Sequence, residues 1–184
     1  RSKLLPNVTP TFFEIEGAPT VTKRRFVDED LNRLFEVYFC GEEPIPDAVD
    51  DEVCGWLNAN LKAFDVVIVP DFGNGFISPN MINELCRSAR FLGVNTQLNS
   101  GNRGHHVIGR YPRADFVAIN EPELRLAAHN RHGPLEGVAE TIAKKVHADC
   151  IAITYGSKGA MFKVCSSGDV HYVPALSTKV LDRI

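Results

Sequence analysis

The length, composition and charge of the chain are those of one globular domain. It has 184 residues, of which 44% are hydrophobic and 23% are charged. The chain is therefore long enough and apolar enough to bury a core, which excludes a short peptide and a disordered chain. Lys and Arg together number 20 against 23 Asp and Glu, which leaves a net charge of -3. Because that charge creates no field that attracts polyanions, we expect neither a nucleic-acid partner nor a membrane partner.

The five cysteines are widely spaced, odd in number and without a Cys-x-x-Cys pair. This pattern is typical of reduced thiols rather than of disulfides or a zinc site, so we expect a cytoplasmic protein. No apolar run reaches the length of a membrane span, about 18 residues, and the first residues lack the apolar stretch of a signal peptide. Position 1 is not Met, and the chain stops within an apolar run at 180–184. We therefore expect a piece of a longer polypeptide.

The N-terminal part is predicted to be β. Residues 20–27 and 33–39 are rich in β-branched and aromatic side chains and flank a polar turn, which predicts a hairpin. A basic run lies on its first strand. Alternation along a strand sends Lys23 and Arg25 to one face and Arg24 to the other. The face of Lys23 and Arg25 is a candidate contact for a substrate phosphate, or plain solvent-exposed surface.

After a breaker segment at 41–46, the pattern changes to alternating helices and strands. Apolar spacing predicts a helix over 47–64, followed by buried strands at 65–69, from 93, at 115–119 and at 150–154. Helices are predicted between them, from Ser78 to about Leu92, over 122–130 and over 137–147. Segments 160–164 and 170–173 indicate antiparallel edge strands. The chain is therefore predicted to be an α/β core over 41–184 with a mainly parallel sheet, preceded by a β segment over 1–40.

Four polar, glycine-rich loops follow the predicted strands, at 70–75, 95–104, 120–123 and 154–159. Ligands of open α/β sheets bind outside the carboxyl ends of the strands. Since these loops are expected at that edge, they form the site hypothesis.

The segment 120–123 opens a helix and allows two interpretations. In the first, Asn120 donates to a phosphate and Glu123, directly or through water, helps hold Mg²⁺, which prefers oxygen ligands. In the second, Asn120 is the N-cap, Pro122 lies in the first turn and Glu123 completes a capping box. Spacing alone favours the capping box, because such motifs are common.

The turn 154–159 contains two glycines, which allow close approach of a ligand or a tight turn. Thr154 and the backbone of Gly156 are candidate contacts for a phosphate or a ribose, and a plain β-turn is the alternative. This motif is weak by itself.

Two further loops carry candidate residues. The loop beginning at Asn95 is rich in neutral donors, which suits a nucleotide or sugar-phosphate site, although solvated loops are often polar as well. Asp71 follows a strand, where it either orients a substrate hydroxyl or serves as a turn residue. The pair His105-His106 lacks nearby ligand partners in sequence, so we expect surface residues rather than a metal site.

Taken together, these loops resemble the C-terminal part of a PfkB-type (ribokinase-like) carbohydrate kinase. The resemblance rests on Pro-Asp-Phe-Gly-Asn-Gly at 70–75, Asn-Glu-Pro-Glu at 120–123 and Thr-Tyr-Gly-Ser-Lys-Gly at 154–159, in that order. Within that family, the chain is similar to the sugar kinase half of the bifunctional enzymes of ADP-heptose synthesis. Residues 19–27 look like the segment after the sugar-covering lid of that family.

The resemblance implies a ribokinase-like three-layer sandwich that transfers the γ-phosphoryl group of ATP to a hydroxyl of a sugar or sugar phosphate. ATP and Mg²⁺ are the implied cofactors, and a fused nucleotidyltransferase domain and a homodimer are the implied partners. The roles implied are nucleotide or phosphate binding for Asn95, Asn120, Thr154, Gly156 and Gly159, substrate binding for Lys23, Arg25 and Asp71, and metal binding for Glu123.

The sequence departs from the family pattern in three places. The glycine-rich sugar-binding segment of the family is absent. The Gly-Ala-Gly-Asp signature, which supplies the anion hole and the catalytic base, is expected directly after Ile184, with Asp182 matching only the acidic residue that opens it. Asn74 stands where this branch often has Lys. We therefore expect no phosphoryl transfer by the chain as given, and a non-catalytic nucleotide-binding or regulatory domain is the alternative function.

Overall fold

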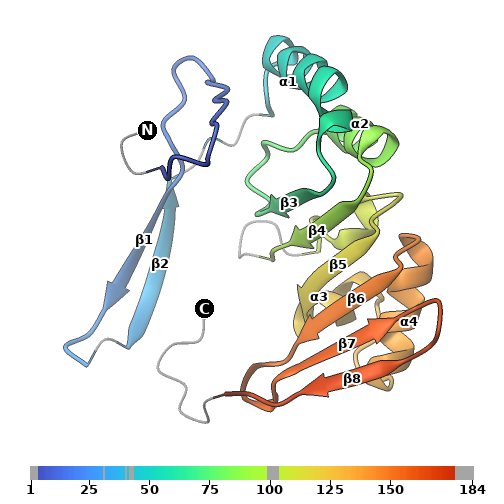
Figure 1. Ribbon diagram of the computed structural model, residues 1–184. Coiled ribbons are helices and arrows are strands. Elements are labelled where there is room, and N and C mark those ends of the chain that lie inside the picture. Colours follow the sequence, from blue (N-terminus) through green and yellow to red (C-terminus); the bar gives the residue numbers. More distant parts are fainter. Residues whose placement is uncertain (1–3, 31, 40, 42–43, 99–103, 177–184) are drawn as a thin grey trace.

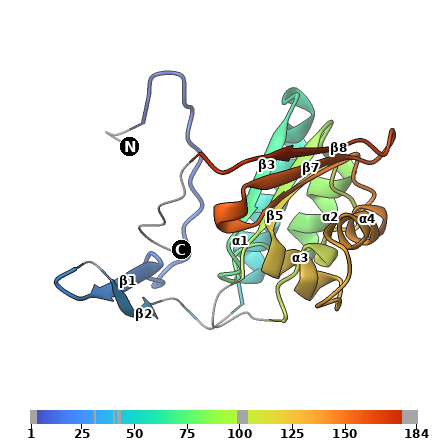
Figure 2. The same ribbon diagram turned by 90° about the horizontal axis from the view of Figure 1, so that it is seen from below.

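The computed structural model describes residues 4–30, 32–39, 41, 44–98 and 104–176. They form a two-stranded sheet and a six-stranded sheet, which stand apart in both views (Figures 1 and 2). The predicted strand-like run at 180–184 and Asp182 lie outside the described residues. No helix of the described part is long and apolar enough to cross a membrane.

The two-stranded sheet is the predicted hairpin. Strands β1 (Thr22–Val27) and β2 (Arg33–Phe39) pair antiparallel, and the Phe26 and Phe35 rings stack with centroids 4.4 Å apart on one face. Asp28 orders the turn, since its Oδ1 accepts from the backbone N–H groups of Asp30 and Asn32. The prediction of a hairpin over 20–39 is confirmed.

The six-stranded sheet has the order β3-β4-β5-β6-β7-β8 (Figure 1). Its first four strands are parallel and its last two are antiparallel. The strands span Val67–Asp71 (β3), Leu92–Thr96 (β4), Phe116–Asn120 (β5), Cys150–Thr154 (β6), Ala160–Val164 (β7) and Val170–Val173 (β8). The mainly parallel sheet and the antiparallel edge predicted from the apolar runs are both confirmed.

The helices cover one face of this sheet, as Figure 2 shows. Consecutive parallel strands are neighbours and their crossovers share one hand, which places all the helices on the same side. The side chains of Val69, Val117 and Ile151 point into this layer and are buried, whereas Ile68 on the opposite face is 74% exposed. The helices are α1 (Asp47–Asn60), α2 (Pro79–Ser88), α3 (Glu121–Ala127) and α4 (Leu135–Lys145), with short 3-10 turns η1 (Leu61–Ala63), η2 (Ile108–Arg110) and η3 (Gly156–Lys158).

Helix α2 is shorter than predicted. Ser78 caps its start by accepting from the N–H of Met81, as the sequence Ser-Pro suggests. The helix ends at Ser88 rather than near Leu92, since Ala89 is already extended and β4 begins at Leu92, and Arg113, which lies beyond that strand, binds carbonyls at the helix end. The Arg113 guanidinium donates to the carbonyl oxygens of Cys86 and Ala89, both at 3.0 Å. This cap comes from a residue 24 to 27 positions away in sequence, which a local pattern does not reveal.

Candidate functional site

The predicted loops emerge at one edge of the sheet, the carboxyl edge of the parallel strands (Figure 1). The parallel register places Asp71 opposite Thr96, and Asn120 opposite Thr154. Strand ends that align in this way bring side chains from distant parts of the sequence together. The common location predicted for the four loops is thus confirmed for their described residues, while residues 99–103 lie outside the described part.

Asn95 holds two strands together at this edge. Strands β4 and β5 pair only at Gly93 with Phe116 and at Val94 with Val117. Beyond that point, Asn95 Nδ2 donates to the Ala118 carbonyl at 2.7 Å, so a side chain replaces the backbone ladder. Asn95 is half-buried, one N–H of its amide binds β5, and its role in nucleotide binding stays a prediction.

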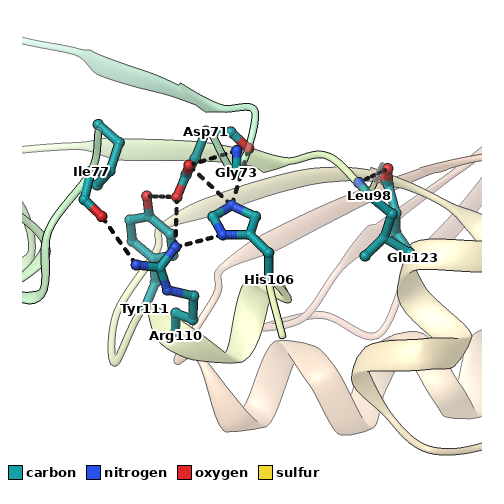
Figure 3. Close-up of polar contacts among 8 residues, drawn as sticks. All are labelled: Asp71, Gly73, Ile77, Leu98, His106, Arg110, Tyr111 and Glu123. Carbon is teal, nitrogen blue, oxygen red and sulfur yellow. Dashed lines mark hydrogen bonds and ion pairs between the residues drawn. The ribbon is translucent and has the colours of Figure 1, made fainter. Parts of the chain in front are cut away.

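Asn120 and Glu123 form the capping box that the spacing favoured. The Asn120 Oδ1 accepts from the Glu123 N–H at 2.8 Å, and the Glu123 Oε2 accepts from the Asn120 N–H at 2.9 Å. The other oxygen of Glu123, Oε1, accepts from the backbone N–H of Leu98 at 3.1 Å (Figure 3). Glu123 therefore joins the start of α3 to the loop that follows β4.

This arrangement does not fit Glu123 as a direct ligand of a hydrated magnesium ion. Each of its carboxylate oxygens already accepts a backbone N–H, and the residue is only 6% exposed. Among the described residues, no group of three or more His, Cys, Asp or Glu side chains could hold a metal ion. A magnesium role of Glu123 stays a prediction.

Two glycines in the turn after β6 were predicted to contact a nucleotide, and the structure gives them different surroundings. Gly156 has a φ of +68° with open space where a side chain would project, which suits the approach of a ligand. Gly159 has a φ of +100°, and a Cβ there would clash with the Val173 carbonyl and lie 2.9 Å from the Ala175 nitrogen. The chain itself therefore requires a glycine at position 159. Thr154, at the end of β6, is exposed.

Lys23 and Arg25 share one face of the hairpin, as alternation predicts, while Arg24 lies over the Phe39 ring on the other face. Both cations converge on Glu36, at 3.3 Å from Lys23 Nζ and 2.6 Å from Arg25 Nε. Desolvation of Glu36 raises its pKa, but the hydrogen bonds from Arg25, Lys23 and Arg33 together outweigh this and lower the pKa to about 2. The face carries more positive than negative charge.

Asp71 is the centre of a polar group of Asp71, His106, Arg110 and Tyr111, here called the Asp71 cluster, in which all but the half-buried Arg110 are buried (Figure 3). Tyr111 Oη donates to Asp71 Oδ2 at 2.8 Å, and His106 Nε2 lies 3.0 Å from Oδ1. Arg110 Nη1 approaches Oδ2 at 3.5 Å. Burial raises the pKa of the Asp71 carboxyl, but the hydrogen bonds from His106 and Tyr111 outweigh it and hold the pKa below its ordinary value.

Two predictions change with this geometry. The expectation that His105 and His106 are both surface residues is wrong for His106, which is 6% exposed, and right for His105. His106 is buried because Asp71, 35 residues earlier, supplies it with a partner. Asp71 is 3% exposed and its carboxylate is hydrogen-bonded within the chain, while its role toward a substrate stays a prediction. No local signal at His106, Arg110 or Tyr111 indicates these contacts.

Several curated proteins similar in sequence carry the name bifunctional protein HldE. The chain is 23% identical over 177 residues to the bifunctional protein HldE of Trichlorobacter lovleyi, covering 95% of this chain and 35% of that protein. It is 26% identical over 170 residues to HldE of Citrifermentans bemidjiense, covering 91% and 34%. The chain thus spans about a third of the length of these relatives. No protein-family model matches the chain.

Solved structures of sugar kinases share its fold. Ribokinase from Giardia lamblia matches 90% of this chain and 52% of its own, with a TM-score of 0.63 and 14% identity. Ribokinase from Thermotoga maritima matches 88% and 50%, with a TM-score of 0.65 and 14% identity. A PfkB protein from Polaromonas matches 87% and 55%, with a TM-score of 0.62 and 17% identity.

The chain has a ribokinase-like α/β fold. These matches confirm the predicted fold class and the resemblance to PfkB-type carbohydrate kinases. The described residues supply the sheet and one helical layer of the ribokinase-like sandwich. The division into a β segment over 1–40 and a core over 41–184 stays a prediction, as do the roles of the individual site residues.

Proposed function

We propose that this chain is the nucleotide-side part of an ATP-dependent sugar kinase, which transfers the γ-phosphoryl group of ATP to a hydroxyl of a sugar or sugar phosphate. The observation that carries the proposal is the turn after β6. There, exposed Thr154 and unobstructed Gly156 lie beside the capped start of α3, at the carboxyl edge of a ribokinase-like sheet. Similarity to HldE favours a heptose phosphate as the acceptor.

In this proposal, ATP binds along the edge formed by β5 and β6. Gly156 lets a ligand approach the backbone, and the exposed Thr154 lies opposite Asn120 on the neighbouring strand. The Oδ1 of Asn120 is used in its own cap, which leaves its Nδ2 to donate to a phosphate. Phosphoryl transfer depends mainly on such positioning and on charge stabilisation. ATP supplies the transferred group.

The acceptor side of the proposal involves the hairpin and the loop after β3. Lys23 and Arg25 are proposed to attract the phosphate of a sugar phosphate, because their face keeps excess positive charge after pairing with Glu36. Asp71 is proposed to act from the interior, by holding the loop that follows β3. Similarity to a bifunctional relative supports a nucleotidyltransferase in the same polypeptide, and a homodimer remains part of the proposal.

A non-catalytic nucleotide-binding or regulatory domain is the second candidate. It is favoured by the state of the carboxylates at this edge, since Asp71 and Glu123 are buried and hydrogen-bonded within the described chain. A phosphoryl acceptor needs a positioned base to take its proton. In the kinase proposal that base follows Ile184, and in the alternative no base is required.

Nucleotide binding is tested with a matched pair of glycine variants. Gly156 and Gly168 both have positive φ values, +68° and +77°, and open space around the missing side chain. Alanine at either position is therefore destabilised by a similar amount of backbone strain, about 1 kcal/mol. Calorimetric titration with ATP should show weaker binding for Gly156→Ala and unchanged binding for Gly168→Ala. Equal affinity in both variants would exclude the turn as a nucleotide contact.

Catalysis is tested on the complete polypeptide that the gene encodes, by following ATP consumption with a panel of phosphorylated heptoses and hexoses. Sugar-dependent turnover supports the kinase. ATP binding without turnover on any acceptor, in a polypeptide that contains the Gly-Ala-Gly-Asp signature, would favour the regulatory alternative.

A further inference from the structure

The Asp71 cluster joins two connections of the fold that are far apart in sequence. On one side lies the loop between β3 and α2, in which the Gly73 N–H donates to Asp71 Oδ1 at 3.2 Å and Ile77 presents its carbonyl. On the other side lies the connection between β4 and β5, which contributes His106, Arg110 and Tyr111. Arg110 Nη2 donates to the Ile77 carbonyl at 3.0 Å and so reaches across from one connection to the other (Figure 3).

The contacts of His106 determine where its ring proton lies. Arg110 Nη1 is 2.6 Å from His106 Nδ1. A guanidinium can only donate hydrogen bonds, so Nδ1 must accept and carries no proton. The proton of a neutral ring then lies on Nε2, which faces both the carboxylate Oδ1 and the main-chain oxygen of Asp71, at 3.0 and 3.3 Å. Each ring nitrogen therefore has a partner of the correct polarity only in this one tautomer.

The charges around His106 disfavour a proton on its Nδ1, both in the other neutral tautomer and in the imidazolium. The groups that face it are the Asp71 carboxylate and the Arg110 guanidinium, while the Tyr111 hydroxyl binds the second oxygen of Asp71. Burial and the neighbouring carboxylate raise the pKa of Tyr111, which stays neutral. A proton on Nδ1 would set donor against donor and cation against cation, at a ring that is only 6% exposed.

We propose that His106, held as the neutral Nε2–H tautomer between Asp71 and Arg110, is a positioning residue that locks the loop after β3 to the connection after β4. Its value for catalysis rests on the proposed function, because those loops then border the acceptor side of the site. The lock itself is a property of the fold. It can be measured without any activity.

The tautomer is tested on the full chain labelled with ¹⁵N-histidine, from the chemical shifts of the two ring nitrogens. At neutral pH, the His106 resonances should show an unprotonated Nδ1 and a protonated Nε2, assigned by their loss in His106→Gln. His105 is the matched control, since it is adjacent in sequence and exposed. An Nδ1–H tautomer or an imidazolium at His106 at neutral pH would overturn the proposal.

The lock is tested by hydrogen exchange of the Gly73 amide, which reports the opening of the loop after β3. His106→Ala removes both ring nitrogens and with them the contacts to Asp71 and Arg110, so at neutral pH the Gly73 amide should lose about tenfold in protection relative to wild type. His105→Ala, at the exposed neighbouring position, should change that protection less than twofold. Equal protection in His106→Ala and wild type, or the same loss in both variants, would contradict the lock.

Kinetics on the complete polypeptide separate this proposal from the proposed function. His106→Asn keeps an acceptor for Arg110 but loses the donor to Asp71. The loss of one hydrogen bond to a charged group should raise the KM for the acceptor sugar about tenfold. The KM for ATP should be nearly unchanged. His105→Gln should change neither constant. If the spectroscopic results hold and no kinase activity exists, the proposed function fails and the lock stands. Activity with unaltered acceptor KM and unaltered Gly73 protection in His106→Asn would overturn the lock alone.

Discussion

Replacing Tyr111 with phenylalanine removes one hydrogen bond of the Asp71 cluster and little else. The Tyr111 ring is fully buried and stays in place in the variant, while the 2.8 Å bond from its hydroxyl to Asp71 Oδ2 is lost. A hydrogen bond to a charged group contributes about 1.5–3 kcal/mol, and the buried carboxylate finds no water to replace it. We therefore expect Tyr111→Phe to lower the free energy of unfolding by about 2 kcal/mol.

Urea unfolding followed by circular dichroism measures this loss. With a denaturant dependence of about 2 kcal/mol per molar urea, the midpoint should fall by about 1 M. Tyr172→Phe is the matched control, because Tyr172 donates to Glu136 at the surface, where the loss of one such bond should leave the midpoint unchanged. Equal midpoints for the two variants would refute the claim that the Asp71 cluster is stabilised by the Tyr111 hydroxyl.

The effect of Tyr111→Phe on the free energy of unfolding should become smaller at low pH. Because the pKa of Asp71 is lower in the folded chain than in the unfolded one, its carboxylate stabilises the fold fully above the unfolded pKa, about 4. This stabilisation is lost as the pH falls through the lower pKa that Asp71 has in the folded chain. The difference in the free energy of unfolding between wild type and Tyr111→Phe should therefore become smaller below about pH 4. A difference that grows there would contradict a lowered pKa of Asp71.

Further variants test the edge of the sheet. Glu123→Gln should lower the urea midpoint by an amount equivalent to about 1–2 kcal/mol and speed exchange of the Leu98 amide, since the side chain loses a charged acceptor. An unchanged midpoint would exclude the capping box as a stabilising contact. Gly159→Ala should prevent normal packing of β8, because its Cβ would overlap the Val173 carbonyl, whereas Gly156→Ala should remain folded. Near-ultraviolet circular dichroism distinguishes these two outcomes, and a native spectrum for Gly159→Ala would contradict the clash.

Local sequence determined the elements of this protein. The β-branched and aromatic residues at 20–27 and 33–39, on either side of a polar turn, predicted a hairpin, and the apolar runs of β3 and β6 predicted buried strands. The spacing of Asn120 and Glu123 predicted a capping box for the same reason, since both partners lie within one helical turn. Alternating elements then implied a parallel sheet, and with it a common edge for the loops.

Tertiary structure decided what the side chains at that edge do. The partners of Asp71 lie 35 to 40 residues away, and the donor that Glu123 meets at Leu98 lies 25 residues away, so no window of sequence contains both members of a pair. Gly159 differs from Gly156 only because the backbone after β8 passes beside it. Contacts of this kind depend on which strands become neighbours and in which register. The sequence by itself therefore located the loops of the candidate site, and the packing of distant segments determined which of their side chains are hydrogen-bonded within the chain.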